Sequence, residues 1–591
     1  MSVKISPIRA SISLPSVAAC LTDIAIFSGL TLPDRAAWQS LPRAVRLALV
    51  EAADTALAQP FPQISAGLYG LFCQTGDRAT FEAAYFARRR MLNAMVIGEA
   101  VEGKGRFCAV IDRAITQICD EPGWQLPAHN SQSRGGKIAP QPDPKNPVVD
   151  LFAAETAALL AVAASLVDTQ LSARIDAEIQ TRVLTPYLTR QFWWTGQGGG
   201  RMNNWTVWCT QNILIAALSR PAFAGLRGQI AERAGFSLDA FLAEYGDDGA
   251  CPEGVYYYKH AALCLFTALD LLNTVSAGSV APVFASQKLR NIAEFLLLAH
   301  IDGDNYANFG DAAAKMAPPD PRVYRFAKAV GSADLAHFAL RAGWASDPLD
   351  ISLYDRVQAL FTARETAKKP SPREGFAPSI GLFVARDPVF FIAATAGSNG
   401  NDHNHNDVGS VILYKNGAPV LIDLGVETYT AETFSTARYD IWTMQSSFHN
   451  LPEFGGVMQQ AGVGFDARDV RSRFTPDEAL LDMDIAGAYP PEARLVSYQR
   501  RVLLRRGRGV SITDHYDGEL APIMNLILAQ KPKISAGQIC VGDAQIILTG
   551  AGRIEVEEIE ITDPRLAASW PGPVYRARLT FSGQSLRLEI T

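Results

Sequence analysis

The chain has 591 residues, which is more than one hydrophobic core usually supports, so we expect at least two domains. Hydrophobic residues make up 48% and charged residues 19% of the sequence, as in ordinary globular proteins, and no apolar run approaches the length of a membrane span. The formal net charge of −6 excludes a global basic field for nucleic acid, so an anionic partner would need a local basic cleft.

The start of the chain does not resemble a secretory leader. Residues 1–21 contain Lys4 and Arg9 among short apolar stretches, without a sustained apolar core and a small-residue cleavage site. We therefore expect a cytoplasmic protein, or a periplasmic or secreted one if a leader is missing from the sequence. Eight cysteines without paired spacing favour reduced thiols. We expect no nucleic-acid or membrane partner, and a homo-oligomer stays open.

Helical periodicity dominates the chain up to residue 370. Apolar residues recur at the helical spacing between Val45 and Ala56 and again between Phe152 and Ala163, where Asp150 is a candidate N-cap. Similar segments cover 79–98, 105–120, 173–188, 205–219, 221–243, 255–275, 284–300 and 321–342. Many helices joined by loops indicate a bundle, a solenoid or a closed toroid, and the spacing alone does not choose among them.

The period changes to two after Lys368-Lys369-Pro370-Ser371-Pro372, which is a candidate linker. Residues 411–414 and 420–423 are predicted strands, and Asn416-Gly417 between them is a hairpin turn signal. Further strands are predicted at 495–504, 510–513, 554–561 and 579–590. The sequence thus predicts an α+β protein with a helical domain at 1–370 and an antiparallel β-sandwich or stacked-sheet domain at 371–591.

Histidines concentrate in the second domain, where three of the eight in the chain lie between residues 403 and 449. On a strand, His403 and His405 would point to the same face and offer two imidazoles to one pocket. We predict that His405, Asp423 and His449 hold one divalent metal ion. A ligand set of mixed nitrogen and oxygen type suits Zn²⁺ and does not exclude Mn²⁺.

The histidine cluster is open to two other interpretations. These residues could be ordinary polar side chains of loops and strands, but Asn404, Asn406 and Asp407 are poor strand formers, so some other demand keeps them there. A cupin-type oxygenase also uses a His-x-His pair and a later histidine. Cupins usually place a glutamate shortly after the second histidine, where this chain has Asp407-Val408-Gly409.

Short motifs from both domains carry a resemblance to a known family. They lie, in chain order, at 85–89, 101–106, 126–130, 203–205, 403–410, 420–423 and 441–450. In these motifs the sequence resembles the heparinase II/III-like polysaccharide lyases, and most closely their broad-specificity glycosaminoglycan lyases. The resemblance implies an (α/α) toroid followed by antiparallel β-sheets.

The resemblance also assigns roles to individual residues. It places the family's metal ligands on His405, Asp423 and His449, and a histidine next to the substrate on His403. The asparagine of the toroid falls within Asn203-Asn204, and the catalytic tyrosine falls within residues 252–258. There the chain departs from the family pattern Pro-Gly-Tyr-Trp, because Val255-Tyr256-Tyr257-Tyr258 replaces it and aligns Tyr257 with the catalytic tyrosine. Lys259 and His260 are also unusual, so substrate preference is in doubt.

A lyase of this kind removes the C5 proton of a uronic acid and expels the oxygen at C4. Asn204, together with Asn203, is expected to hold the uronate carboxylate, although the pair equally suits a helix cap before Trp205. Tyr257 is the expected base, acid or both. A base role requires nearby positive charge to lower its pKa, and Arg201, Lys259 and His260 are available. His403 is the alternative base on the opposite face of the sugar.

The expected function is a β-eliminating lyase for uronic-acid-containing glycans, either glycosaminoglycan or alginate-like, with the site between the two domains. Arg88 and Arg438 are predicted to bind the anionic polysaccharide or oligosaccharide, and His129 and Asn130 to contact its sugars. The metal is expected to be mainly structural. The alternatives are a glycoside hydrolase on the same scaffold, which could use Glu253, Asp248 and Asp311, and a non-catalytic carbohydrate-binding protein.

Overall fold

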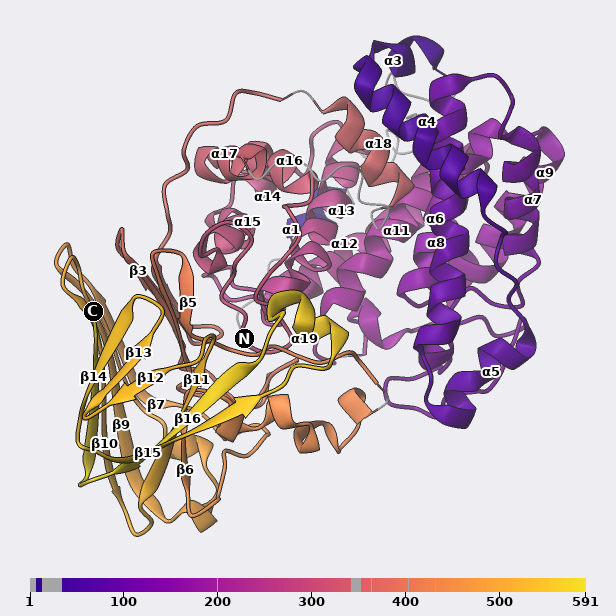
Figure 1. Cartoon of the computed structure of the whole chain (residues 1–591). Helices are drawn as coiled ribbons and strands as arrows, with labels where there is room; N and C mark the ends of the chain where they lie inside the picture. The colour runs from indigo at the N-terminus through magenta and orange to yellow at the C-terminus, as the bar shows by residue number, and fades with distance from the viewer. Residues whose placement is uncertain are drawn as a thin grey trace.

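The computed structural model describes residues 7–12, 34–198, 200–341, 352–362, 364–401, 403–430 and 432–591. Helices occupy the chain up to Phe361, and strands begin at Gly375 (Figure 1). The predicted order of a helical region followed by antiparallel sheets is confirmed. The expected boundary at residue 370 falls between the last helix of the first region and the first strand of the second. None of the helices in these ranges is long and apolar enough to cross a membrane.

The helical region forms a toroid around a central lumen. Its helices are α1 Pro7–Ile12, α3 Arg35–Ser40, α4 Arg43–Ala58, α5 Ala66–Thr75, α6 Ala79–Glu102, α7 Cys108–Cys119, α8 Leu151–Ala163, α9 Thr169–Ile179, α10 Thr185–Thr189, α11 Asn204–Ser219, α12 Arg227–Glu244, α13 Ala262–Val275, α14 Ala281–Phe284, α15 Gln287–Ala299, α16 Arg322–Ala329, α17 Ala333–Arg341 and α18 Leu353–Phe361. Nearly every residue of α8 and α11 is buried, because these two helices pack together in the middle of the layer.

Local sequence explains where these helices begin and end. Asp150 caps α8 as predicted, since its side chain accepts a hydrogen bond of 2.7 Å from the backbone of Ala153. The segment predicted at 321–342 contains two helices within the described residues, α16 and α17. Gly331 lies between them with φ 70°, a left-handed conformation that interrupts a helix. The segment predicted at 255–275 starts as a short 3₁₀ turn, η6 (Val255–Lys259), before α13.

The second domain contains two antiparallel sheets. Its strands are β1 Gly375–Ala377, β2 Leu382–Arg386, β3 Phe390–Thr395, β4 Val411–Lys415, β5 Ala418–Leu421, β6 Pro452–Phe454, β7 Arg468–Phe474, β8 Glu478–Asp484, β9 Leu495–Arg505, β10 Gly509–Gly518, β11 Pro522–Leu528, β12 Lys533–Ser535, β13 Gln538–Val541, β14 Ala544–Thr549, β15 Ala551–Ile559, β16 Val574–Phe581 and β17 Ser585–Ile590. One sheet has the order β1-β2-β3-β4-β5-β11-β16-β15, with β6 on β11, and the other β12-β13-β14-β17-β10-β9-β8-β7.

The predicted strands are found, with differences in extent. Asn416 and Gly417 both have positive φ, 50° and 78°, as the tight hairpin between β4 and β5 requires. The segment predicted at 579–590 proves to be the end of β16 and the whole of β17, joined by a turn. One-turn helices and long loops, rather than strands, fill residues 422–430 and 432–451. These loops carry Asp423 and His449.

Apolar packing fixes the two domains against each other. One core lies between the two sheets and includes Val502 and Leu588. The other face of the first sheet contributes Val384, Phe391 and Ile412 to the same cluster that fills the toroid. Helix α19 (Pro564–Ser569), from the end of the chain, lies between the sheets and the helices (Figure 1). The loops of the β domain are thereby held against the toroid.

Candidate active site and metal centre

His405, Asp423 and His449 meet in the interior of the β domain. Each offers one ligand atom, and these atoms all lie within 4.8 Å of one another. His405 precedes β4, Asp423 follows β5, and His449 follows a one-turn helix at 446–448. Asn450 fixes this arrangement, because its amide donates to the carbonyls of Val411 and Ile422 and so ties the segment to β4 and to the end of β5.

The three side chains fit a divalent metal ion. All are fully buried, yet His405 Nδ1 and His449 Nε2 form no hydrogen bond of normal geometry. Unpaired buried polar atoms are rare and call for an explanation such as an ion. Two imidazole nitrogens and a carboxylate are the donor set that zinc favours. Asp423 is further oriented by the backbone of Gly425, which donates to its Oδ1 at 2.9 Å.

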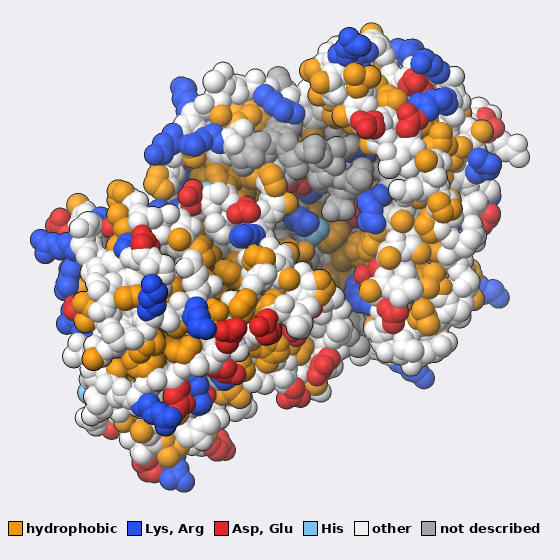
Figure 2. All heavy atoms as spheres, viewed as in Figure 1, with side chains coloured by type: hydrophobic (Ala, Val, Ile, Leu, Met, Phe, Trp, Pro, Cys, Tyr) orange, Lys and Arg blue, Asp and Glu red, His pale blue; other side chains and the backbone are white. Residues whose placement is uncertain are grey.

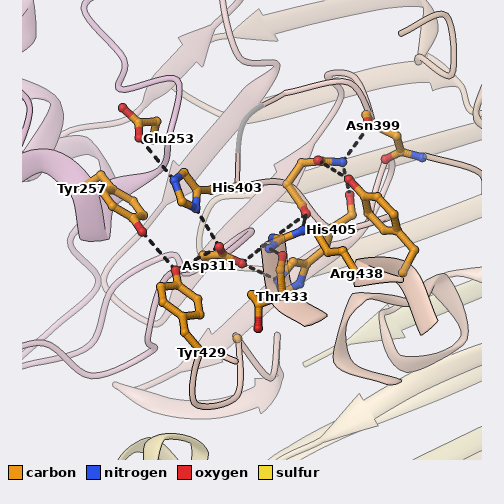
Figure 3. A network of polar contacts seen from close by, with 12 residues as sticks. Glu253, Tyr257, Asp311, Asn399, His403, His405, Tyr429, Thr433 and Arg438 are labelled. Atoms are coloured by element: carbon orange, nitrogen blue, oxygen red, sulfur yellow. Dashed lines mark hydrogen bonds and ion pairs between the residues drawn. The ribbon is translucent and has the colours of Figure 1, made fainter. Parts of the chain in front are cut away.

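The expectation that His403 and His405 lie on a strand is wrong. The pair is in a loop, and His403 has φ 57°, a left-handed conformation incompatible with a strand. The two rings do not share the face of a strand. They instead contact the two carboxylate oxygens of one residue, Asp311. His403 Nδ1 lies 2.8 Å from Oδ2 and His405 Nε2 lies 3.3 Å from Oδ1 (Figure 3).

Asp311 is the centre of this polar network. Its fully buried carboxylate also accepts hydrogen bonds from Tyr429 Oη at 2.9 Å and from the guanidinium of Arg438 at 2.6 Å (Figure 3). Burial alone would raise the pKa of Asp311, but the hydrogen bonds of His403 and His405 and the charge of Arg438 hold it well below its usual range. Asp311 is therefore an ionised acceptor that orients four side chains.

Sequence reasoning missed the central position of Asp311 and named it only as a hydrolase carboxylate. Its loop belongs to the helical domain and presses closely on the β domain. A Cβ on Gly310 would lie 2.6 Å from the carbonyl oxygen of His403, and one on Gly425 would lie 2.6 Å from that of Ala312. Both glycines have positive φ. Two glycines in the sequence are consistent with this contact, Gly310 directly before Asp311 and Gly425 two residues after Asp423, because glycine lets two backbones approach closely.

Tyr257 reaches the network from η6 of the toroid. Its ring stacks on that of His403, with centroids 4.2 Å apart, and its hydroxyl shares a hydrogen bond of 3.1 Å with Tyr429. Burial, together with Tyr429 and Asp311, raises the pKa of Tyr257 well above its usual value. The lowering that a base role requires is therefore not found, and a neutral hydroxyl that can donate a proton is favoured.

Two of the cations expected near Tyr257 contact other rings. Lys259 is 5.9 Å from the centre of the Tyr256 ring, and the His260 ring stacks on Trp208 at 4.0 Å. A further cation is Arg565 of α19, whose guanidinium lies 4.4 Å from the centre of the Tyr429 ring and 5.2 Å from that of Tyr256. No periodic or motif signal pointed to Arg565.

The asparagine pair serves two purposes, one for each residue. Asn203 is the N-cap of α11, because its side chain accepts from the backbone of Trp205 at 3.1 Å. The backbone of Asn204 donates to Glu253 Oε1 at 2.8 Å, and Glu253 Oε2 lies 3.5 Å from His403 Nε2. Glu253 thus connects the start of α11 to the histidine loop. Tyr257 and the backbone of Asn204 are thus both connected to His403, the first by ring stacking and the second through Glu253.

The predicted substrate-binding residues are divided by the structure. Arg438 lies in the network, where it also donates to the carbonyl of Asn404 at 3.0 Å. Arg88 is a correction, since it is buried and paired with Glu121 at 2.9 Å. Asn130 is a second correction, because its amide is occupied by Gln125 and by backbone carbonyls of its own loop.

His129 occupies an intermediate position. Its Nδ1 lies 2.7 Å from Asp150, the cap of α8, and its ring lies 4.7 Å from that of Trp205. Because Trp205 follows Asn204 directly in the sequence, His129 lies near the start of α11. It is not part of the network in Figure 3.

A cavity of about 540 Å³ opens in the lumen of the toroid beside the network. Tyr256, Lys259 and His260 of the η6 region form part of its wall, whereas Asn204, Tyr257 and His403 do not line it. The Tyr256 ring packs edge-on against the Tyr257 ring at 5.6 Å, so the η6 turn separates the cavity from the network. Figure 2 shows the hollow, with a histidine and basic side chains at its edge.

The cavity has a cationic lining in an acidic protein. The arginine, lysine, aspartate and glutamate residues that line it are Arg89, Arg90, Lys259, Lys315, Arg322, Glu155, Asp320 and Asp355. Five cations face three carboxylates, an excess of two positive charges, whereas the whole chain carries −6. This is the local basic cleft that an anionic ligand requires.

Comparisons with known proteins agree with this architecture. Residues 369–585 match the family described as Heparinase II/III-like, C-terminal. No curated protein matches the sequence significantly. Among solved structures, a mutant of heparan sulfate lyase HepC from Pedobacter heparinus is 15% identical with a TM-score of 0.60, over 97% of this chain and 86% of that chain. A heparinase III structure is 13% identical with a TM-score of 0.64, over 97% and 88%.

A chondroitin AC lyase from Streptomyces coelicolor A3, solved with chondroitin sulphate, is 11% identical with a TM-score of 0.51, over 97% of this chain and 82% of that chain. At such identities the likeness is one of fold. The whole chain therefore shares the toroid-and-sheet fold of these lyases. Its C-terminal domain is similar to that of the heparinase II/III-like family.

Proposed function

We propose that the protein is a polysaccharide lyase that cleaves uronic-acid-containing glycans by β-elimination, at the seam between the toroid and the β domain. The single observation that carries the proposal is that Tyr257 and, through Glu253, the backbone of Asn204 meet His403 from distant segments beside a cation-lined cavity. The names of similar structures include lyases for heparan sulfate and chondroitin, which are uronic-acid polymers, and this favours the same substrate class.

His403 is the base in this proposal. When its Nδ1 carries the proton, it donates to Asp311, which leaves a lone pair on Nε2. That atom takes the C5 proton of the uronate. The electron pair of the C5–H bond forms the C4–C5 double bond as the bond from C4 to the glycosidic oxygen breaks. Glu253, 3.5 Å from Nε2, stabilises the resulting imidazolium.

Tyr257 is the acid. Its raised pKa keeps the hydroxyl protonated, and the leaving oxygen takes that proton as the C4–O bond breaks. Tyr429, hydrogen-bonded to Tyr257 and to Asp311, orients the hydroxyl. Asn204 would hold the uronate carboxylate, which gains negative charge as the C5 proton leaves. Arg438 stays with Asp311 and fixes the loop around it.

A divalent ion on His405, Asp423 and His449 would mainly order the loop that carries His403. His405 is two residues from His403, and both rings contact Asp311. When bound, the ion supplies positive charge in a buried site without the substrate having to touch it. Zn²⁺ fits the donor set, and Mn²⁺ is the alternative to be compared in a metal analysis.

The glycoside hydrolase alternative finds little support in the geometry. A hydrolase needs a carboxylic acid that can donate a proton. Asp311 is held ionised by four donors, and Asp248 accepts hydrogen bonds from Ser379 at the domain seam. Neither of these two is placed as a proton donor, and Glu253, the third candidate, accepts a hydrogen bond from the backbone of Asn204.

The test is a panel of uronic-acid polymers that includes heparan sulfate, chondroitin sulfate, hyaluronan and alginate, incubated with the purified protein with and without chelator. Elimination produces a conjugated, ultraviolet-absorbing double bond and an unsaturated sugar in the mass spectrum. Saturated products would favour hydrolysis, and the absence of products from every polymer would count against an enzyme of this class.

A further inference from the structure

Aromatic rings continue from the candidate active site along the wall of the toroid. His260 follows Tyr257 at a centroid distance of 6.4 Å, and Trp208 stacks on His260 at 4.0 Å with an angle of only 3° between the planes. Phe152 is next, 5.6 Å from Trp208. Trp208, His260 and Phe152 all line the cavity. The catalytic proposal above uses none of these three.

The row extends beyond the cavity along α11. His129 stacks on Phe152 at 6.0 Å, and Trp205 lies 4.7 Å from His129. Trp205 and Trp208 are three residues apart, so they share one face of α11. Trp205 also follows Asn204 directly, which brings the row back to the asparagine of the site. We call Trp208, His260, Phe152, His129 and Trp205 the aromatic track.

Core packing does not account fully for the track. Each of its five members remains partly exposed, whereas the ring of Tyr85, which lies against Phe152, is buried. The indole of Trp208 donates to Glu155 at 3.1 Å, which holds its ring in place at the cavity wall. Partly exposed, fixed aromatic rings at a cavity wall are suited to stacking against a flat ligand.

Two lysines line the same cavity as the track. Neither Lys259 nor Lys315 forms an ion pair within 4 Å of a carboxylate among the residues that the structure describes, although Lys259 acts electrostatically on Asp320. Other cations of the cavity lining form ion pairs within the protein. Arg89 is paired with Glu121, and Arg322 is paired with Asp320. Lys259 belongs to the stretch where the chain departs from the family pattern.

We infer that the aromatic track is a binding site for the sugar units of an acidic oligosaccharide beyond the pair that is cleaved. The apolar faces of the sugar rings stack on Trp208 and its neighbours, and Lys259 and Lys315 bind carboxylate or sulfate groups. This inference rests on the proposed function, but it concerns binding, so it can be tested without turnover. In this inference the toroid determines the length and charge of the substrate that binds, and the residues between the two domains carry out the elimination.

The experiment uses the full chain with Tyr257→Phe, so that no ligand is consumed. Hexasaccharides and disaccharides of heparan sulfate, chondroitin sulfate and alginate are titrated by calorimetry. We expect at least one hexasaccharide to bind, and Trp208→Leu or Lys259→Met in that background to weaken its affinity about tenfold, or about 1.4 kcal/mol. The disaccharide of the same polymer should be affected less than twofold, about 0.4 kcal/mol.

Trp442→Leu in the same background is the matched control. Trp442 is also partly buried and also donates its indole N–H to a glutamate, Glu427, at 2.9 Å, but it does not line the cavity. Its hexasaccharide affinity should not change. Thermal unfolding identifies variants that fold as the parent does, and Lys259→Met, which removes only a partly exposed charge, supports the test if Trp208→Leu is unstable.

Two results would overturn the inference. One is a hexasaccharide affinity of both Trp208→Leu and Lys259→Met within twofold of the parent, about 0.4 kcal/mol. The other is the absence of binding by all six probes. Failure of the proposed function looks different, because the wild-type protein would then bind a hexasaccharide, lose that binding on Trp208→Leu, and yet release no unsaturated product.

Discussion

Replacing Asp311 by asparagine tests the centre of the site. The Asp311 carboxylate accepts hydrogen bonds from His403, His405, Tyr429 and Arg438, and it is fully buried. An amide keeps the shape but removes the charge and replaces one acceptor oxygen with a donor. At least one of the four donors then faces another donor.

The size of the effect follows from these contacts. A hydrogen bond to a charged group contributes about 1.5–3 kcal/mol, and breaking a buried ion pair costs about 3–5 kcal/mol. The side chain of Arg438 is 11% exposed, so water compensates part of its loss, and the lower end applies. We expect the unfolding free energy of Asp311→Asn to fall by about 3 kcal/mol.

The activity of Asp311→Asn should fall by more than its loss of stability explains. His403 loses the carboxylate that fixes its tautomer, and general-base catalysis contributes about 10²–10⁴-fold to a rate. We expect kcat to fall about a hundredfold or more at temperatures where the variant is fully folded, measured as unsaturated product released from the best polymer of the panel. Urea unfolding followed by circular dichroism gives the stability.

Asp248→Asn is the control for Asp311→Asn. Asp248 also joins the two domains, since it accepts from the backbone and hydroxyl of Ser379, but it lies outside the network. Its variant should keep its activity. If Asp311→Asn retained kcat within threefold and its stability within about 0.5 kcal/mol, the role given to Asp311 would be wrong, since that change is no larger than an ordinary surface substitution causes.

Three further substitutions address the other parts of the site. His405→Ala should lower both the bound metal, measured by elemental analysis, and the unfolding midpoint; no change in either would contradict the metal centre. Tyr257→Phe should lower kcat by about 10²-fold or more while costing only about 1 kcal/mol of stability, because it loses one hydrogen bond, to Tyr429; a wild-type rate would exclude it as the acid. Asn204→Ala should lower kcat by about 10²–10³-fold, since its contact strengthens in the transition state, whereas a change confined to KM would show uniform binding instead.

Much of the fold is predictable from the sequence because its signals are local. Asp150 caps α8 through a residue three positions away, and the two residues of the 416–417 turn determine the hairpin between β4 and β5. The helix break at Gly331 and the loop conformation of His403 were missed. In both cases a left-handed backbone, which a spacing of apolar residues does not reveal, decided the structure.

The candidate site was only half predictable, for a different reason. Motifs identified His405, Asp423 and His449, which lie close in sequence, and the family resemblance added Asn204 and Tyr257. Asp311 is 92 residues from His403, and Tyr429 is 172 residues from Tyr257. Contacts over such separations depend on how the two domains dock, and neither composition nor periodicity encodes that docking.

The late position of Arg565 has a consequence for biosynthesis. This side chain, in α19 near the end of the chain, donates to the carbonyl of Asp311 at 3.0 Å and lies over the rings of Tyr256 and Tyr429. A ribosome makes the toroid and the strands up to β15 before it makes α19. The nascent protein can therefore complete this network only after α19 has emerged. A product truncated before α19 would lack these contacts, and under the proposed function it would lack turnover.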